Sequence, residues 1–212
     1  MNAEILLFDG FDELDAFGPW EILSGAAQVS EGFEARFVTL EGAREVRADH
    51  GAVVRAHGAL SEVPDVLVIP GGGWFDRTPE GAWAQAQRGA IPHAIAERHA
   101  AGTVIASVCT GALLVARSGI LEGRTATTNP GAYDDLRAAG ADVVEARVVD
   151  DGDIVTAGGP ACGLDLVLHL VEREFGADAA ALAAREIHYD RPAGAVHVQN
   201  AASSLASPTG SS

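Results

Sequence analysis

Short apolar runs rich in β-branched residues alternate along the chain with longer, alanine-rich stretches of mixed polarity. Short apolar runs are typical of strands, and the mixed stretches are typical of amphipathic helices. Three of the runs, ILLF, VLVI and TVIASV, are almost continuously apolar, as expected for strands that are covered on both faces. The alternation favours an α/β fold with a mostly parallel central sheet and helices on both faces. The expected strands are Glu4–Phe8, Phe33–Thr39, Val66–Ile69, Thr103–Val108 and Ile154–Ala157.

Helix starts are indicated by prolines and by turn residues that precede the alanine-rich stretches. Proline is favoured in the first turn of a helix, because the amide hydrogen that it lacks has no partner there. We expect helices to begin at Pro19, near Pro79, at Thr110, near Gly131 and at Cys162.

Two valine-rich segments predict β-hairpins. The stretch from Glu45 to Arg55 alternates in part, which is typical of a hairpin at the edge of the sheet. The pairs Val143-Val144 and Val148-Val149 lead into Asp150-Asp151-Gly152-Asp153. This order predicts a second hairpin with a DG-type turn.

The length of 212 residues suits one well-buried core. From about Pro192 the chain becomes small and polar and ends in ASSLASPTGSS. Such a composition cannot bury enough apolar surface to order itself. We therefore expect one domain over residues 1–190 and a flexible C-terminal tail, without a catalytic role, over residues 191–212.

The charge of the chain excludes several function classes. The net charge is −16, which disfavours nucleic-acid binding because clustered cations are needed to replace phosphate counterions. All 14 cationic residues are arginine. The absence of lysine excludes a Walker A phosphate loop and any lysine Schiff-base mechanism. The acidity itself is compatible with a role in solubility alone.

The two cysteines, Cys109 and Cys162, are too few for a disulfide scaffold and lack the spacing of a zinc site. We therefore expect free thiols, no metal and no cofactor. The apolar runs are all shorter than the roughly 18 residues of a membrane span, and the N-terminus has no basic leader pattern. These features favour a cytoplasmic protein with no membrane partner.

Cys109 stands where the apolar run Thr103–Val108 ends and a helix is expected to begin. Open α/β sheets bind ligands at the carboxyl ends of their strands. The N-terminus of a helix also lowers a thiol pKa, because its dipole and free amide hydrogens favour the thiolate. We therefore interpret Cys109 as a nucleophile on a strand-to-helix elbow, with Thr110 beside it, although a buried inert cysteine is the commoner case.

Two further segments are expected beside this elbow. Pro70-Gly71-Gly72-Gly73 follows a central strand, and amide hydrogens near Gly72 and Gly73 are candidates for an oxyanion hole. Asp15 follows the first strand and has apolar neighbours on both sides. A carboxyl group held against a thiolate in a dry pocket has a raised pKa, so Asp15 is a candidate general acid and base.

The segment Thr156–Asp165 repeats the order of strand, glycine turn and helix. It is expected to close the far side of the same crevice, with Gly159 as a candidate substrate contact. Cys162, at the start of the helix, is interpreted as structural, with a resolving thiol as the alternative.

Together these four segments resemble the ThiJ/PfpI superfamily, from about Ala3 to Ile187. The similarity lies in Asp15 four residues before Pro19, the PGGG loop, the ASVCTGA elbow and the TAGGxxxGLD segment. It implies a flavodoxin-like sandwich and a homodimer. Aspartate in LDxxGPxE together with Cys-Thr at the elbow resembles the isonitrile hydratase branch, which is also similar to the sensor domains of some AraC-type regulators.

The chain departs from many relatives in one respect. They carry a histidine after the elbow, either directly behind the cysteine or in a TTHW-type segment. Here these positions read Thr110 and, in Thr127-Thr128-Asn129-Pro130, asparagine. A peptidase-type Cys-His dyad is therefore not expected, and His169 and His188 are distant candidates on predicted helices.

The resemblance implies two enzymatic functions, both on a small electrophile, and a non-enzymatic function remains a third alternative. The first is hydration of an isonitrile to an N-substituted formamide through a covalent thioimidate at Cys109. The second is a glyoxalase or deglycase-type thiol activity, against which Asp15 counts because relatives of that kind usually have glutamate there. The third is a non-enzymatic sensor of a ligand or oxidant that uses Cys109. A cysteine-dependent α/β-hydrolase, suggested by the SxCxG spelling at Ser107, would need a later histidine near Cys109.

Overall fold

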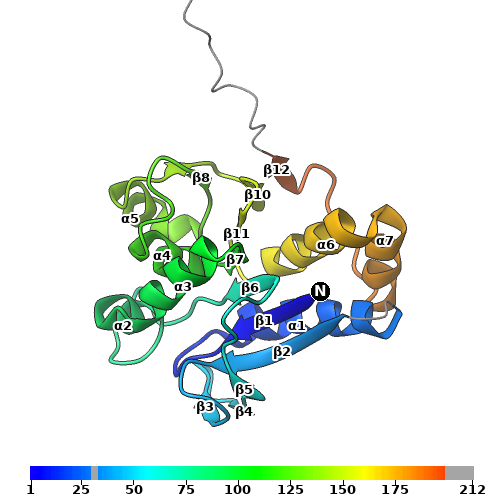
Figure 1. Cartoon of the computed structure of the whole chain (residues 1–212). Helices are drawn as coiled ribbons and strands as arrows, with labels where there is room; N and C mark the ends of the chain where they lie inside the picture. The colour runs from blue at the N-terminus through cyan, green and yellow to red at the C-terminus, as the bar shows by residue number, and fades with distance from the viewer. Residues whose placement is uncertain (30–32, 199–212) are drawn as a thin grey trace, which may run out of the picture.

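The computed structural model describes residues 1–29 and 33–198, and in these residues an eight-stranded sheet runs through the centre of the molecule (Figure 1). All of its pairings are parallel except the one between the third-last and second-last strands of the chain, which form a hairpin. The expected mostly parallel sheet is therefore confirmed. In spatial order the strands are β12 (Val196–Val198), β10 (Val148–Asp150), β11 (Ile154–Ala157), β7 (Val104–Val108), β6 (Val66–Ile69), β1 (Asn2–Leu6), β2 (Glu34–Thr39) and β5 (Gly58–Ala59).

Helices cover both faces of this sheet (Figure 1). One group packs together as α1 (Glu13–Val29), α6 (Cys162–Phe175) and α7 (Ala177–Glu186). The other group comprises α2 (Ala82–Arg88), α3 (Ala90–Ala100), α4 (Gly111–Arg117) and α5 (Tyr133–Ala138), with the short 3-10 helix η1 (Pro130–Ala132) before α5.

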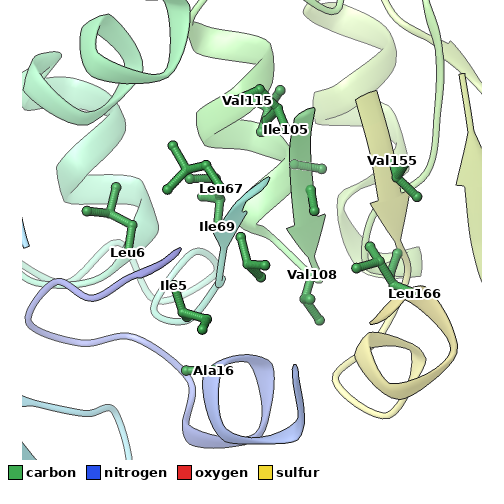
Figure 2. Close-up of a cluster of buried hydrophobic side chains, with 14 of the residues drawn as sticks. Ile5, Leu6, Ala16, Leu67, Ile69, Ile105, Val108, Val115, Val155 and Leu166 are labelled. Atoms are coloured by element: carbon green, nitrogen blue, oxygen red, sulfur yellow. The ribbon is translucent and has the colours of Figure 1, made fainter. Parts of the chain in front are cut away.

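The core lies where the central strands meet the helices of both groups. Strands β6 and β11 are buried at every position, because each is covered on both faces. Figure 2 shows side chains from β1, β6, β7 and β11 in contact with residues of α1, α4 and α6. The carboxyl ends of these central strands carry the loops that the sequence singled out.

The first helix begins earlier than expected. Asp12 caps it, because its Oδ1 accepts hydrogen bonds from the amide groups of Leu14 at 2.9 Å and Asp15 at 3.3 Å. The helix therefore runs from Glu13, and Pro19 lies inside it instead of at its start. The prediction was wrong because the acidic cap outweighs the single intrahelical hydrogen bond that proline cannot donate.

The other helix starts lie close to their predicted positions. The helix expected near Pro79 begins at Ala82, the one expected at Thr110 begins at Gly111, and the one at Cys162 is confirmed. Near Gly131 the chain forms η1 and then α5. In the described part of the chain, no helix combines the length and the apolar character that crossing a membrane would require.

Both predicted hairpins are present, with one change each. Strands β3 (Glu45–Arg47) and β4 (Val53–Arg55) pair antiparallel, but as a separate sheet instead of at the edge of the main one. The second hairpin joins β10 to β11, and its turn is closed by a bond from Gly152 N to Asp150 Oδ1 of 2.8 Å. The upstream valine pair does not belong to it, because β9 (Asp142–Val143) pairs with β8 (Thr125–Ala126).

The expected tail contains a strand. Residues Val196–Val198 form β12, which extends the main sheet by parallel pairing with β10. The main-chain hydrogen bonds of this edge position explain why a segment with little apolar surface joins the sheet. The rest of the predicted tail, residues 199–212, lies outside the described residues.

A close backbone contact fixes the elbow after β7 against the end of β6. A Cβ atom at position 111 would overlap the carbonyl oxygen of Ile69 and would lie 2.9 Å from the carbonyl carbon of Pro70. We expect Gly111→Ala to destabilise the fold by about 1–3 kcal/mol, since backbone atoms must move to admit the methyl group. Urea unfolding checks this value.

The matched control is Gly58→Ala, because a Cβ atom at position 58 meets no other atom within 4 Å. Its free energy of unfolding should change by less than about 0.5 kcal/mol. Equal stability of the two variants would contradict the proposed packing at Gly111.

Candidate active site

Cys109 occupies a sharp turn between β7 and α4. Its φ angle is 55°, in the left-handed region that non-glycine residues rarely adopt. This conformation costs on the order of 1–3 kcal/mol and needs support from its surroundings. The Cys109 amide donates to the carbonyl oxygen of Ala157 at 3.0 Å, and Thr128 Oγ1 donates to the Cys109 carbonyl oxygen at 2.8 Å. The expected elbow is therefore present, held by hydrogen bonds on both sides.

Asp15 points into the protein beside this elbow. Its side chain is fully buried, and Oδ2 accepts a hydrogen bond from the Gly71 amide at 2.8 Å. Oδ1 is buried without a well-formed hydrogen bond to any described residue. Burial raises the pKa of the Asp15 carboxyl well above its usual range, and the charge of Asp12 adds to this, whereas the Gly71 amide and the Cys109 thiol oppose it.

The thiol of Cys109 does not have the lowered pKa that its position before a helix predicts. The residue is 7% exposed, and burial together with the nearby Asp15 charge raises the pKa of the thiol to about 12. Hydrogen bonds from Asn129 and from the Thr110 amide act in the opposite direction. The expectation was wrong because desolvation of the sulfur outweighs the polar groups at the start of a seven-residue helix.

Asp15 and Cys109 therefore compete for protons. Two buried groups in contact cannot both carry a negative charge without a large energetic cost. Their titration belongs to the pair, and loss of a proton from one group opposes its loss from the other. With the thiol pKa at about 12, the resting sulfur at neutral pH is protonated. A thiolate forms when a base accepts its proton, and the adjacent carboxylate is placed to do so.

The structure adds one residue, Asn129, to the site residues that the sequence predicted. Its Nδ2 lies 3.4 Å from Cys109 Sγ and donates toward it, while its Oδ1 accepts from the Gly131 amide at 3.0 Å. The sequence signal was the TTNP segment, in which asparagine stands where relatives carry histidine. A neutral amide stabilises a thiolate by hydrogen bonding, but it cannot take up a proton.

Neither of the distant histidines contacts the thiol. His169 Nε2 lies 2.6 Å from Asp150 Oδ2, and His188 follows α7 at a φ of 51°. Arg173 also contacts Asp150, at 3.2 Å. Burial raises the pKa of the Asp150 carboxyl, but the contacts with His169 and Arg173 outweigh it, so the pKa is lowered. These contacts join β10 to α6 and do not involve the elbow.

The triple-glycine loop lies directly against the elbow, but two of its amide groups already donate hydrogen bonds within the protein. Gly71 N donates to Asp15, and Gly72 N donates to Thr110 Oγ1 at 3.1 Å. Gly72 can therefore act as an oxyanion donor only after it gives up this bond. A Cβ atom at Gly73 would face Glu80 and Gly81, so that residue packs against the following loop. The hydroxyl of Thr110 thus positions the loop, while its amide faces the sulfur.

The segment after β11 supports the elbow from the other side. The Gly159 carbonyl oxygen accepts from the Cys162 amide at 2.9 Å in the first turn of α6, and a Cβ atom at Gly159 would meet nothing within 4 Å. Among the described residues, the polar groups that affect the pKa of the Cys109 thiol belong to Asp15, Asn129, Thr110 and Asp12, not to Gly159. Cys162 is buried, and both cysteines are free thiols.

The described ranges hold no group of three or more histidine, cysteine or acidic side chains suited to a metal ion. The chemistry that these residues can perform themselves is addition of a thiol with proton transfer. Cys109 supplies the sulfur, Asp15 supplies a group that accepts and returns a proton, and Asn129 and Thr110 supply hydrogen bonds to the sulfur.

Replacing Asp15 tests the electrostatic coupling of the pair. In Asp15→Asn the carboxylate charge that disfavours the thiolate is absent, so the pKa of Cys109 should fall below about 12. The rate of iodoacetamide alkylation as a function of pH, measured in a Cys162→Ser background, reports this pKa. Glu21→Gln, an equal charge change at an exposed position of α1, is the control and should leave the profile unchanged. An unshifted profile in Asp15→Asn would contradict the coupling.

Replacing Asn129 tests the hydrogen bond to the sulfur. Asn129→Ala removes the donor and should raise the pKa of Cys109, so that alkylation at a fixed pH becomes slower. Asn129→Asp keeps the oxygen that accepts from Gly131 but replaces the donor with a charge, so it should slow alkylation further. If both variants react at the rate of the parent protein, Asn129 does not contribute to the state of the thiol.

Comparison with known proteins identifies the family of the chain. The family model described as DJ-1/PfpI family matches residues 1–173. Isonitrile hydratase of Pseudomonas putida is 29% identical over 191 residues, which cover 89% of this chain and 78% of that protein. A deglycase of Thermococcus kodakarensis is 31% identical over 164 residues, covering 76% of this chain and 91% of that protein.

A solved structure has the same fold. The crystal structure of a ThiJ/PfpI family protein from Pseudomonas syringae superposes with a TM-score of 0.79 at 28% identity, and the match covers 90% of this chain and 76% of that one. The predicted resemblance and the flavodoxin-like α/β fold are thus confirmed. The chain belongs to the DJ-1/PfpI family.

Proposed function

We propose that this protein is a cysteine-dependent hydratase that converts an isonitrile to an N-substituted formamide. The observation that carries the proposal is the buried Asp15 carboxyl beside the Cys109 thiol, with Asn129 instead of a histidine as the third contact. This arrangement suits an electrophile that needs one sulfur nucleophile and one proton at the same carbon. The isonitrile hydratase of P. putida among the relatives supports the same reaction class.

In the first step the thiol adds across the terminal carbon of the isonitrile. The Asp15 carboxylate accepts the proton of Cys109, and the sulfur forms a bond to the carbon. Asp15 then donates this proton to the lone pair on the carbon, which leaves a covalent thioimidate, R–N=CH–S–Cys109. Gly71 holds Oδ2 of Asp15, so Oδ1 is the atom free to carry the proton in both transfers.

In the second step water completes the hydration. Water adds to the C=N carbon, a proton moves to nitrogen, and the C–S bond of the resulting intermediate breaks. The products are the N-substituted formamide and the thiol of Cys109, so the enzyme returns to its starting state. The Thr110 amide and Asn129 Nδ2 stabilise charge on the departing sulfur. The reaction uses no cofactor.

The deglycase relatives favour a second candidate, a thiol activity on an aldehyde or a glycated amine. In that reaction Cys109 would attack a carbonyl carbon, and Asp15 would protonate the carbonyl oxygen. The shorter side chain of aspartate, compared with the glutamate usual in such relatives, is the reason to rank this candidate second.

A substrate panel separates the two. We expect the purified protein to convert an alkyl isonitrile to its formamide, and to leave methylglyoxal unchanged. Cys109→Ala should abolish turnover, and Asp15→Asn should lower kcat by about 10²-fold or more, because proton transfer to carbon loses its donor. Formamide release is followed by chromatography.

Cys162→Ser is the matched control, a second buried thiol that should be dispensable. Circular dichroism verifies that each variant remains folded. Turnover by folded Cys109→Ala would overturn the proposal, and turnover of methylglyoxal alone would assign the second candidate.

A further inference from the structure

A cavity of about 270 Å³, which Cys109 does not line, is formed by residues of α2, α4, α5 and the loop that follows the triple-glycine segment. Two indole rings, Trp74 from the loop and Trp83 from α2, form part of its lining. Leu113 of α4 is buried and adds an apolar side chain to the lining. A cavity of this composition accepts a flat apolar body.

Several hydrogen-bond donors that line this cavity have no partner among the described residues, and three of their side chains, Arg77, Gln87 and Arg117, are exposed to solvent. Arg77 and Arg117 line it, and within the described residues neither guanidinium forms an ion pair or a hydrogen bond. The same is true of the side chains of Trp83 and Gln87. The one lining carboxylate, Asp135, already accepts from Trp74 Nε1 at 2.7 Å. Among the lining side chains, donors therefore outnumber acceptors, which are the Asp135 carboxylate and the Gln87 amide oxygen.

Arg77 and Arg117 lack a carboxylate partner in a chain whose net charge is −16, as do Arg47, Arg55 and Arg185 elsewhere in the described residues. Most of the other arginines form ion pairs with carboxylates, and acidic side chains are abundant enough to pair with these two as well. Two guanidinium groups against one carboxylate give the lining one net positive charge. The arginines with carboxylate partners are Arg36, Arg44, Arg98, Arg124, Arg137, Arg147, Arg173 and Arg191.

We propose that this cavity binds a small organic monoanion, a carboxylate carried on an aromatic ring. The ring would lie between Trp74 and Trp83, and the carboxylate would accept hydrogen bonds from Arg77 and Arg117. A planar carboxylate matches the fork of a guanidinium group, which an uncharged amide of the same shape does not. The proposal is independent of the reaction at Cys109, because the thiol does not line this cavity.

Intrinsic fluorescence provides the test, because two of the three tryptophans line the cavity. Titration with 4-nitrobenzoate should quench the fluorescence saturably, with a Kd on the order of 1 mM or tighter for a ligand of this size. The neutral isostere 4-nitrobenzamide should bind at least about fivefold more weakly. Arg77→Gln and Arg117→Gln should each weaken 4-nitrobenzoate binding about threefold or more.

Two control variants test whether the ligand binds in this cavity. Arg55→Gln removes an unpaired arginine from β4 and should leave the Kd unchanged. Cys109→Ser should also leave it unchanged, whether or not the protein hydrates isonitriles. Equal binding of acid and amide, insensitivity to both cavity variants, or loss of binding in Cys109→Ser would each overturn the proposal.

Discussion

The contact between one buried carboxyl and one buried thiol is the constraint on which the site depends. Asp15 reaches Cys109 because α1 packs beside the carboxyl ends of β1 and β6, and the Gly71 amide fixes one oxygen of the carboxyl. Burial raises the pKa of both groups, so the pair retains protons that exposed groups would lose. In the proposed reaction the sulfur therefore becomes a nucleophile through transfer of its proton to Asp15, not through a permanently lowered pKa. A site of this kind suits a reaction in which the proton removed from sulfur is delivered to the substrate.

This arrangement lowers the stability of the folded protein. The pKa of Asp15 is higher in the folded state than in the unfolded chain, so the folded state binds the proton more tightly. Its contribution to stability consequently falls as the pH rises from the ordinary carboxyl range toward the raised folded value. The left-handed conformation of Cys109 adds a second cost. The apolar strands on either side of the elbow offset both, since β6 and β11 are buried throughout.

The apolar pattern was sufficient to predict the central strands and the loops that follow them, because strands buried on both faces leave a continuous apolar run. It also placed Cys109 and Asp15 at one edge of the sheet. It misplaced the start of α1, because the cap at Asp12 and the proline at position 19 give conflicting local signals. It could not predict the direction of the Cys109 pKa shift, since a sequence shows the helix start but not the depth of burial. The apolar pattern also could not predict the hydrogen bond from Asn129 to Cys109, because that contact joins residues 20 positions apart.

The close contact between the triple-glycine loop and the elbow has a consequence for how related proteins can diverge. A Cβ atom at Gly71 would overlap Thr110 Oγ1, and one at Gly111 would overlap Ile69, so side chains cannot be introduced at these positions without moving the backbone. In the proposed enzyme, the residues that distinguish one substrate from another therefore lie outside these interlocked segments. One such residue is Phe75, which is exposed and lies over Gly131, next to Asn129. Packing thus fixes the residues of the elbow, whereas the side chains around it are free to vary.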